Sequence, residues 1–267
     1  MRVRGDSSPL QVPPRLQGQA VGLTPEQWIE AGLFSVDLLC RTLGRENLSG
    51  VELLDVGCGA KISKTLLDNS MPIGCYVGID VSAELIDWLQ ANVSDSRFEF
   101  HHLDAHNALY NPDGVDLGSF DLLPVGERYF DMICLFSVFT HLGPHDYVSM
   151  LRLLRRHAKS DARLLFSLFL IDEEGDAQFA RAIEEQLASP DAEVRQRAQT
   201  VMARSGAHRA VQEGSRFIDE IPDQPLLIAR YEPDYALELI AGTGWDVLEV
   251  HSPEPPFVQH FMICSPV

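Results

Sequence analysis

The chain has 267 residues, 45% of them hydrophobic, and carries 21 Lys and Arg against 39 Asp and Glu, for a net charge of −18. A chain of this length can bury one large core, and its acidic excess disfavours partners that present phosphates, such as nucleic acid or an anionic membrane. The longest apolar run, around 164–171, is too short to span a bilayer, and no apolar run follows the basic N-terminus as in a secretory signal. Neither metal-site spacing nor a disulfide framework is visible in the five cysteines, at 40, 58, 75, 134 and 264. We therefore expect a cytoplasmic protein; the sequence does not indicate its oligomeric state.

Residues 1–23 contain Pro, Ser and Gln and are expected to form a flexible arm, or a strap over the site. Residues 24–267 are expected to form a single domain. The first element of that domain is an amphipathic helix ending near Gly44, because apolar residues recur at alternating steps of four and three. These residues are Ile29, Leu33, Val36, Cys40 and Leu43.

Residues 51–82 predict a β-α-β unit with a ligand loop at its first turn. A buried strand leads into Asp55-Val56-Gly57-Cys58-Gly59, where the glycines let the backbone turn sharply and let a ligand lie against it. Asp55 can face a cationic or hydroxyl-bearing group, and Asp80, which ends the second strand, is placed to accept hydrogen bonds from two ribose hydroxyls. A dinucleotide-binding loop would also need a glycine at position 62, which is Ile62. This favours a ligand with a ribose but no diphosphate.

The pattern Asp55-x-Gly57-x-Gly59 followed by Asp80 resembles the cofactor-binding half of the class I S-adenosylmethionine-dependent methyltransferases. The resemblance implies S-adenosyl-L-methionine as the cofactor, with its methionyl part on the glycine loop and its ribose at Asp80. Many members carry a third glycine where this chain has Lys61, and we expect the loop to tolerate the lysine.

The same resemblance extends the expected cofactor site to the next strands. Val81 lies beside the ribose acid, and Phe136 ends the fourth strand. Asp104, after the third strand, would hydrogen-bond the adenine amino group while Ala105 donates its backbone N–H to the ring. Asp104 could instead be a solvated turn aspartate.

The remaining chain alternates strands and helices until residue 172. Ser82 is expected to cap a helix, and Gly143-Pro144 to start another; strands are expected at 98–103, 130–136 and 162–170. Helical stretches at 178–187 and 192–203 interrupt this order, followed by a helix at 233–241 and strands at 246–251 and 257–264. The resemblance implies an α/β, Rossmann-like sheet of six parallel strands and an antiparallel seventh. The insertion at 173–224 is expected to form a helical cap that shapes the substrate pocket, the alternative being a peripheral decoration.

Two histidines follow the fourth strand, at the edge where open α/β sheets bind ligands. An alcohol needs a general base near pH 7, and His141, in a SVFTHL stretch that resembles sugar and small-molecule methyltransferases, is the first candidate. His145 is the second; His141 could instead be a loop histidine bonded to backbone. Tyr110 and Thr140 are expected to contact the substrate. These residues predict methyl transfer to a hydroxyl of a small polar acceptor, with a carbohydrate as the expected substrate.

Three alternatives stay open. Asp172, Glu173 and Glu174 are oxygen ligands suited to magnesium, although acidic triplets at strand ends are usually solvated, and no metal site is assigned. A nicotinamide-dependent oxidoreductase would also use Asp80, but Ile62 and the terminal pair of strands count against it. A binding module could hold S-adenosylmethionine without catalysis.

Overall fold

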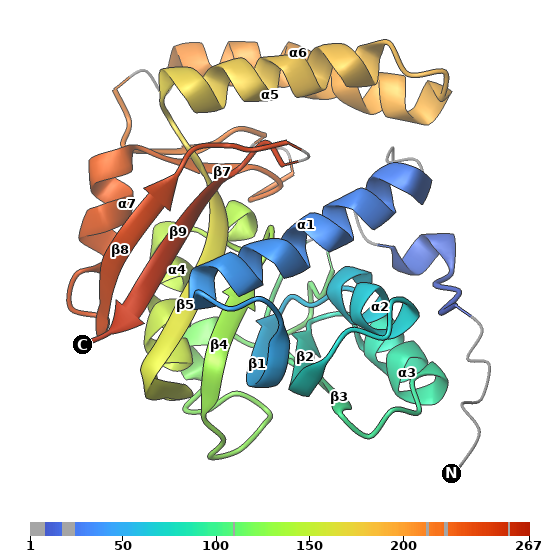
Figure 1. Ribbon diagram of the computed structural model, residues 1–267. Coiled ribbons are helices and arrows are strands. Elements are labelled where there is room, and N and C mark those ends of the chain that lie inside the picture. Colours follow the sequence, from blue (N-terminus) through green and yellow to red (C-terminus); the bar gives the residue numbers. More distant parts are fainter. Residues whose placement is uncertain (1–8, 18–24, 109, 212–213, 222–223, 256) are drawn as a thin grey trace.

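The structure is a computed structural model that describes residues 9–17, 25–108, 110–211, 214–221, 224–255 and 257–267. A mixed sheet runs through the molecule with helices on both faces (Figure 1). The strands are β1 (Leu48–Val56), β2 (Ile73–Asp80), β3 (Phe98–His102), β4 (Phe130–Leu135), β5 (Ala158–Leu170), β6 (Phe217–Asp219), β7 (Ala229–Tyr231), β8 (Trp245–His251) and β9 (His260–Pro266). The α-helices are α1 (Pro25–Leu43), α2 (Lys61–Asp68), α3 (Ala83–Asn92), α4 (Pro144–Arg155), α5 (Glu173–Leu187), α6 (Ala192–Val211) and α7 (Pro233–Ile240).

The order of the strands confirms the expected α/β fold. β3, β2, β1, β4 and β5 are parallel neighbours in that order, and β9 pairs antiparallel with both β5 and β8. β9 is therefore the antiparallel strand inserted beside the last parallel one. The outer edge of β5 is shared, because residues 164–168 pair with β9 whereas Phe169 and Leu170 pair with β7. The short antiparallel pair β6 and β7 extends the sheet beyond the seven expected strands.

The central strands are buried on both faces, as parallel strands usually are. Leu54 and Val56 of β1 pack into the apolar cluster beneath α4 and α7, whereas Val51 and Leu53 belong to the cluster beneath α1, α2 and α3. This alternation follows from the two-residue period of a strand. The turn after α1 is also as expected, because Gly44 adopts a left-handed φ of 62° directly after the helix.

Part of the expected N-terminal arm lies against the domain. The Leu10 N–H donates to Asp68 of α2 at 2.8 Å, and the Leu10 carbonyl accepts from Lys64 Nζ at 2.6 Å. Val12 and Leu16 are buried in the cluster beneath α1, α2 and α3. Residues 1–8 and 18–23 of the arm are outside the described part of the chain.

Helices α5 and α6, which we call the cap helices, form an antiparallel pair above the sheet in Figure 1. A buried ion pair fastens them to the sheet: Arg230 of β7, 1% exposed, bonds Glu220 at 2.9 Å and also bonds Asp176 of α5. The guanidinium also lies 5.7 Å from the centre of the Phe179 ring on α5. Arg230 therefore joins two segments of the insertion, α5 and the segment at Glu220, to β7.

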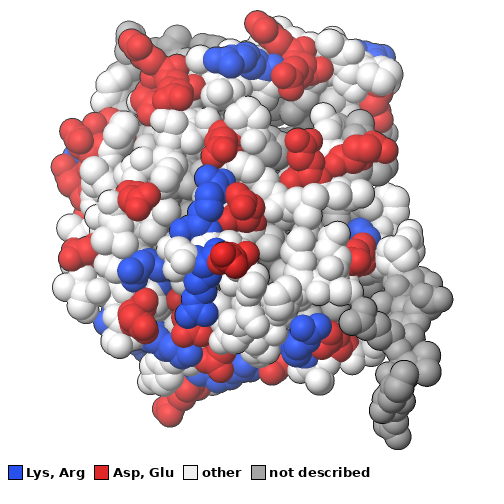
Figure 2. All heavy atoms as spheres, viewed as in Figure 1, with Lys and Arg blue, Asp and Glu red and all other residues white. Residues whose placement is uncertain are grey.

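Acidic side chains are spread over the face seen in Figure 2, including the cap helices, with Lys and Arg among them. This distribution agrees with the net charge of −18. Within the described residues, no helix has both the length and the apolar character needed to cross a bilayer.

Replacing Arg230 with Met should lower the free energy of unfolding by about 3–5 kcal/mol, since it removes the guanidinium that pairs with the buried Glu220 carboxylate. The measurement is urea denaturation followed by circular dichroism. Arg216→Met is the matched control, because Arg216 also bonds two carboxylates but at the surface, where such pairs contribute little. Equal stability of the two variants would contradict a structural role for the buried pair.

Candidate cofactor and acceptor site

The turn after β1 is built from glycines that no other residue could replace without strain. Gly57 and Gly59 have φ values of 70° and 49°, which L-residues with a side chain rarely adopt. A Cβ on Gly57 would lie 2.3 Å from the Val138 side chain, so the loop after β4 approaches this turn closely. At Gly59 a Cβ would meet no atom within 4 Å. The loop therefore leaves open space above its backbone where a ligand can lie.

Asp80 ties this turn to the end of β2. One carboxylate oxygen accepts the Gly59 N–H at 3.0 Å, and the other accepts the Ser82 N–H at 2.9 Å. Burial raises the pKa of Asp80, and the donated N–H groups oppose that shift. The carboxylate thus fixes the loop and lies at the carboxyl end of β2, as expected for a ribose acceptor.

Asp55 is buried at the end of β1, with only 1% of its surface exposed. Its carboxylate accepts a 2.6 Å hydrogen bond from Tyr76 of β2. Burial raises the pKa of Asp55 to about 6, against the opposing effect of the Tyr76 hydroxyl. The group therefore carries a charge at neutral pH that a bound cation would stabilise.

A cavity of about 1150 Å³ opens over these carboxyl ends and beneath the cap helices. Most of the residues expected from the sequence line it. They are Asp55, Gly57, Gly59, Asp80, Val81, Ala105, Tyr110, Phe136, Thr140 and His141.

Two of the expected residues lie elsewhere. Asp104 is exposed and accepts a hydrogen bond from Asn111 Nδ2 at 3.0 Å, so it is a turn aspartate and not part of the cavity wall. This geometry does not favour the expected contact with adenine. His145 is likewise exposed, in the first turn of α4, and does not line the cavity, so the structure does not favour it as a second base.

His141 ends the short 3₁₀ helix Phe139–His141 that follows β4. Its Nδ1 lies 3.1 Å from the carbonyl oxygen of Leu226. Because a carbonyl can only accept, Nδ1 carries the proton in this bond, which leaves Nε2 of the neutral ring as the acceptor. Burial lowers the pKa of His141, with the backbone carbonyls opposing the shift. The ring is therefore neutral at pH 7.

The loop after β4 is held by a polar network that the sequence did not reveal. Ser137 has a strained φ of 59°, its N–H donates to Ser167 Oγ at 2.8 Å, and its hydroxyl bonds the Gln259 amide. The Ser167 hydroxyl donates to the same Gln259 oxygen at 2.6 Å. Thr140, beside this loop, has a buried hydroxyl with no protein partner in the described structure. Strain and an unsatisfied hydroxyl at a cavity wall are typical of binding sites.

The acidic triplet suggested for magnesium has structural partners instead. Asp172 caps α5 by accepting the Gly175 N–H at 2.7 Å and bonds His260, while Glu174 accepts from Ser252. In the part of the chain that the structure describes, the possible metal ligands that converge are different ones. Asp116, His145 and Asp146 bring one ligand atom each within 4.8 Å of one another. Two of the three are exposed, and only Asp146 lines the cavity.

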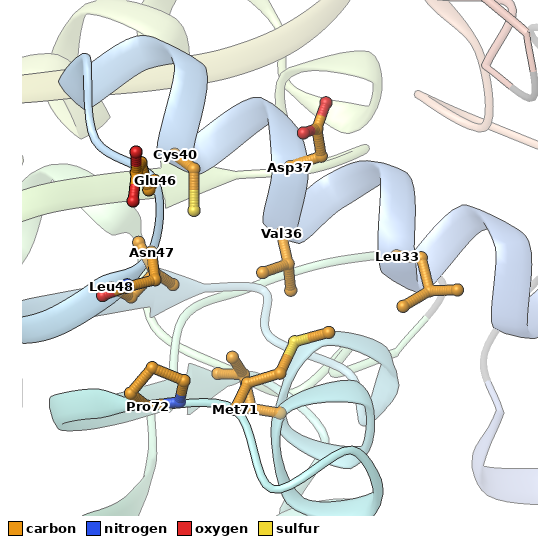
Figure 3. Close-up of a pocket in the computed structure, with 10 residues that line it drawn as sticks. Leu33, Val36, Asp37, Cys40, Glu46, Asn47, Leu48, Met71 and Pro72 are labelled. Atoms are coloured by element: carbon orange, nitrogen blue, oxygen red, sulfur yellow. The ribbon is translucent and has the colours of Figure 1, made fainter.

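A second pocket, of about 250 Å³, lies between α1 and the segments that enter β1 and β2 (Figure 3). Its walls include Val36 and Cys40 of α1 and Met71 and Pro72 before β2. These strand starts are at the opposite edge of the sheet from the glycine turn. None of the expected site residues lines this pocket.

Solved structures share this fold at low identity. Magnesium protoporphyrin IX methyltransferase (ChlM) from Synechocystis PCC 6803, with bound S-adenosylhomocysteine (SAH), superposes with a TM-score of 0.52 and 13% identity over 95% of this chain and 92% of that one. Mitomycin 7-O-methyltransferase MmcR superposes with a TM-score of 0.50 and 14% identity over 93% of this chain and 60% of that one. A variant of LepI, in complex with SAH and a substrate analogue, superposes with a TM-score of 0.51 and 14% identity over 86% of this chain and 46% of that one. This chain thus spans less than two thirds of the length of MmcR and of the LepI variant.

The family comparison goes further than the fold. A family model described as a methyltransferase domain matches residues 30–212, more than half of the chain. The matched region includes the glycine turn, Asp80 and His141, and leaves the nicotinamide alternative without support. The chain therefore belongs to the class I S-adenosylmethionine-dependent methyltransferases, and S-adenosyl-L-methionine is its cofactor.

Proposed function

We propose that the protein transfers the methyl group to a hydroxyl of a small acceptor and that His141 removes the hydroxyl proton. The observation that carries this proposal is the hydrogen bond from His141 to the Leu226 carbonyl, which fixes the ring with Nε2 as a proton acceptor at the cavity wall. The lowered pKa keeps His141 in the basic form at neutral pH. A neutral amine would need no such base, which favours oxygen as the acceptor atom.

The cofactor supplies a methyl group already activated on a sulfonium, so the protein has mainly to align the acceptor with it. Gly57, Gly59 and Asp55 would hold the methionyl end, Asp80 and Val81 the ribose, and Ala105 and Phe136 the remaining contacts. The space above Gly59 fits such a ligand, because a Cβ built there would meet no atom of the described residues within 4 Å. His141 and Thr140 come from the loop after the neighbouring strand β4, where the acceptor hydroxyl would meet them.

The insertion at 173–224 would act as a cap over the acceptor within a single domain of residues 24–267. Its cavity wall is mixed: Phe179, Ile183, Val194 and Val201, next to Phe169, Leu227 and Ile228, are apolar, whereas Gln178, Arg181, Glu185 and Gln186 are polar or charged. The polar side chains suit the sugar expected from the sequence, and the apolar ones would be covered by an acceptor that also has an apolar body. We therefore favour an acceptor that presents one hydroxyl to His141 and an apolar ring to the cap, either a hydroxylated ring compound or a sugar joined to one.

The acceptor class can be tested by incubating the protein with S-adenosylmethionine labelled on its methyl group and a panel of free sugars, glycosides of apolar alcohols and hydroxylated aromatic rings. Label should enter the apolar-bodied members and be released as the methyl ether. Amine analogues of the best acceptor are the control. Preferential labelling of the amines would contradict O-methylation, and no transfer to any member at saturating cofactor would favour a non-catalytic binding module.

Replacing His141 with Asn should lower kcat by roughly 10²- to 10⁴-fold, the usual contribution of a general base, and leave the Kd for SAH unchanged. The rate is followed by methyl transfer and the Kd by calorimetry. His145→Asn is the matched control, because His145 lies four residues on but outside the cavity, and it should retain full activity. The role as base is wrong if the two variants have equal rates.

The dependence of kcat on pH follows from the sign of the His141 shift. Only the neutral ring can take a proton, and a lowered pKa keeps it neutral further into acid, so kcat should rise with pH and level off with a midpoint below 6.5. Assays at saturating cofactor, with the SAH Kd measured across the same pH range, separate this midpoint from that of Asp55, whose pKa is about 6. A midpoint above 7 would exclude His141 as the titrating base.

Replacing Asp80 with Ala should weaken SAH binding roughly 10- to 100-fold, because charge-assisted hydrogen bonds to the ribose and to Gly59 are lost together. Asp104→Ala is the control at the end of the next strand, and its Kd should stay within about twofold of the parent. Calorimetric titration with SAH measures both. A larger loss for Asp104 would mean that the adenine contact implied by the family resemblance forms after all.

A further inference from the structure

Lys61 is the first residue of α2, two residues after Gly59. The residue is partly buried and lines the large cavity beside the glycine turn. Its Nζ lies 4.8 Å from the centre of the Phe257 ring. A long charged side chain thus lies in the cavity wall beside the glycine turn.

The charge on Lys61 has no carboxylate partner among the described residues. The chain has three lysines, and the other two form ion pairs: Lys64 with Asp68, and Lys159 with Glu52 and Asp131 at 2.8 Å each. Asp55 raises the pKa of Lys61 electrostatically, but these two described residues do not form an ion pair. Burial lowers the pKa of Lys61 to about 8. An ammonium group in a partly dry wall would be stabilised by an anion from the ligand.

The start of α2 favours an anion at the same place. The helix has no side-chain cap, because the methyl side chain of its N-cap residue, Ala60, cannot accept a hydrogen bond from the N–H groups of the first turn. The backbone N–H groups of that first turn and the positive end of the helix dipole are therefore directed at the cavity. Two independent features, a lysine and an uncapped helix start, converge beside Gly59.

The cofactor has one anionic group, the α-carboxylate of its amino-acid end, and its ribose is expected at Asp80. We propose that Lys61, together with the first turn of α2, binds this carboxylate and so makes the site selective for ligands with an amino-acid end. The buried Asp55 would face the ammonium of the same zwitterion. A purely structural lysine would instead contribute only its packing on Phe257, which a methionine of similar length retains.

The test compares ligands with and without the carboxylate. SAH has the whole amino-acid end, 5′-methylthioadenosine has only the adenosine and sulfur, and decarboxylated S-adenosylmethionine keeps the ammonium but lacks the carboxylate. Calorimetry should show that Lys61→Met weakens SAH binding roughly 10- to 100-fold, as expected for a charge-assisted hydrogen bond. The affinities for the other two ligands should change by less than about twofold, which also shows that the variant is folded.

Two further variants complete the experiment. Lys61→Arg should restore most of the SAH affinity, and Lys64→Met, which removes a lysine from the same helix but outside the cavity, should leave all three affinities unchanged. The proposal is overturned if Lys61→Met binds SAH as tightly as the parent, or if it loses affinity equally for SAH and 5′-methylthioadenosine. No acceptor is present in these titrations, so their outcome is independent of the role proposed for His141.

Discussion

The site depends on one constraint, the sharp turn after β1 that the Asp80 carboxylate holds from the neighbouring strand. Gly57 and Gly59 can follow this path because both have positive φ, and Asp80 fixes it by accepting the N–H of Gly59. The Gly57 and Cys58 N–H groups donate to the Ile79 carbonyl, so the turn is bound to β2 along its length. A loop rich in glycine therefore has a defined shape, which a ligand that lies on its backbone requires.

The molecule joins a sheet that carries the glycine turn to the insertion, for which we propose the acceptor-binding role. The division occurs at β5, whose edge pairs with β9 along most of its length and with β7 at its end. β7 carries Arg230, which bonds both Glu220 and the first turns of α5. The cap helices are thus joined to β7, which pairs with the end of β5. This attachment positions their apolar side chains over the cavity.

The charged groups in this cavity differ from those at the surface because they are removed from water. Burial raises the pKa values of Asp55 and Asp80 and lowers those of His141 and Lys61. Each shift favours the uncharged form, so a ligand with matching charges gains more here than it would at the surface. A neutral imidazole and an unpaired ammonium in one cavity suit a site that takes a proton from one ligand and binds the zwitterionic end of another.

The sequence by itself determined the alternation of strands and helices up to residue 172, the glycine turn, Asp80 and the position of the insertion. These features depend on local patterns: buried strands, residues that permit positive φ, and an acid at a strand end. Only the tertiary structure decided which loop side chains reach the cavity. Asp104 turns away because Asn111, seven residues on, bonds its carboxylate, whereas His141 is oriented by Leu226, 85 residues away. Lys61 was expected only to be tolerated in the glycine loop, and Asp146 was not expected at the cavity, because local spacing carries no record of how α4 packs against distant segments.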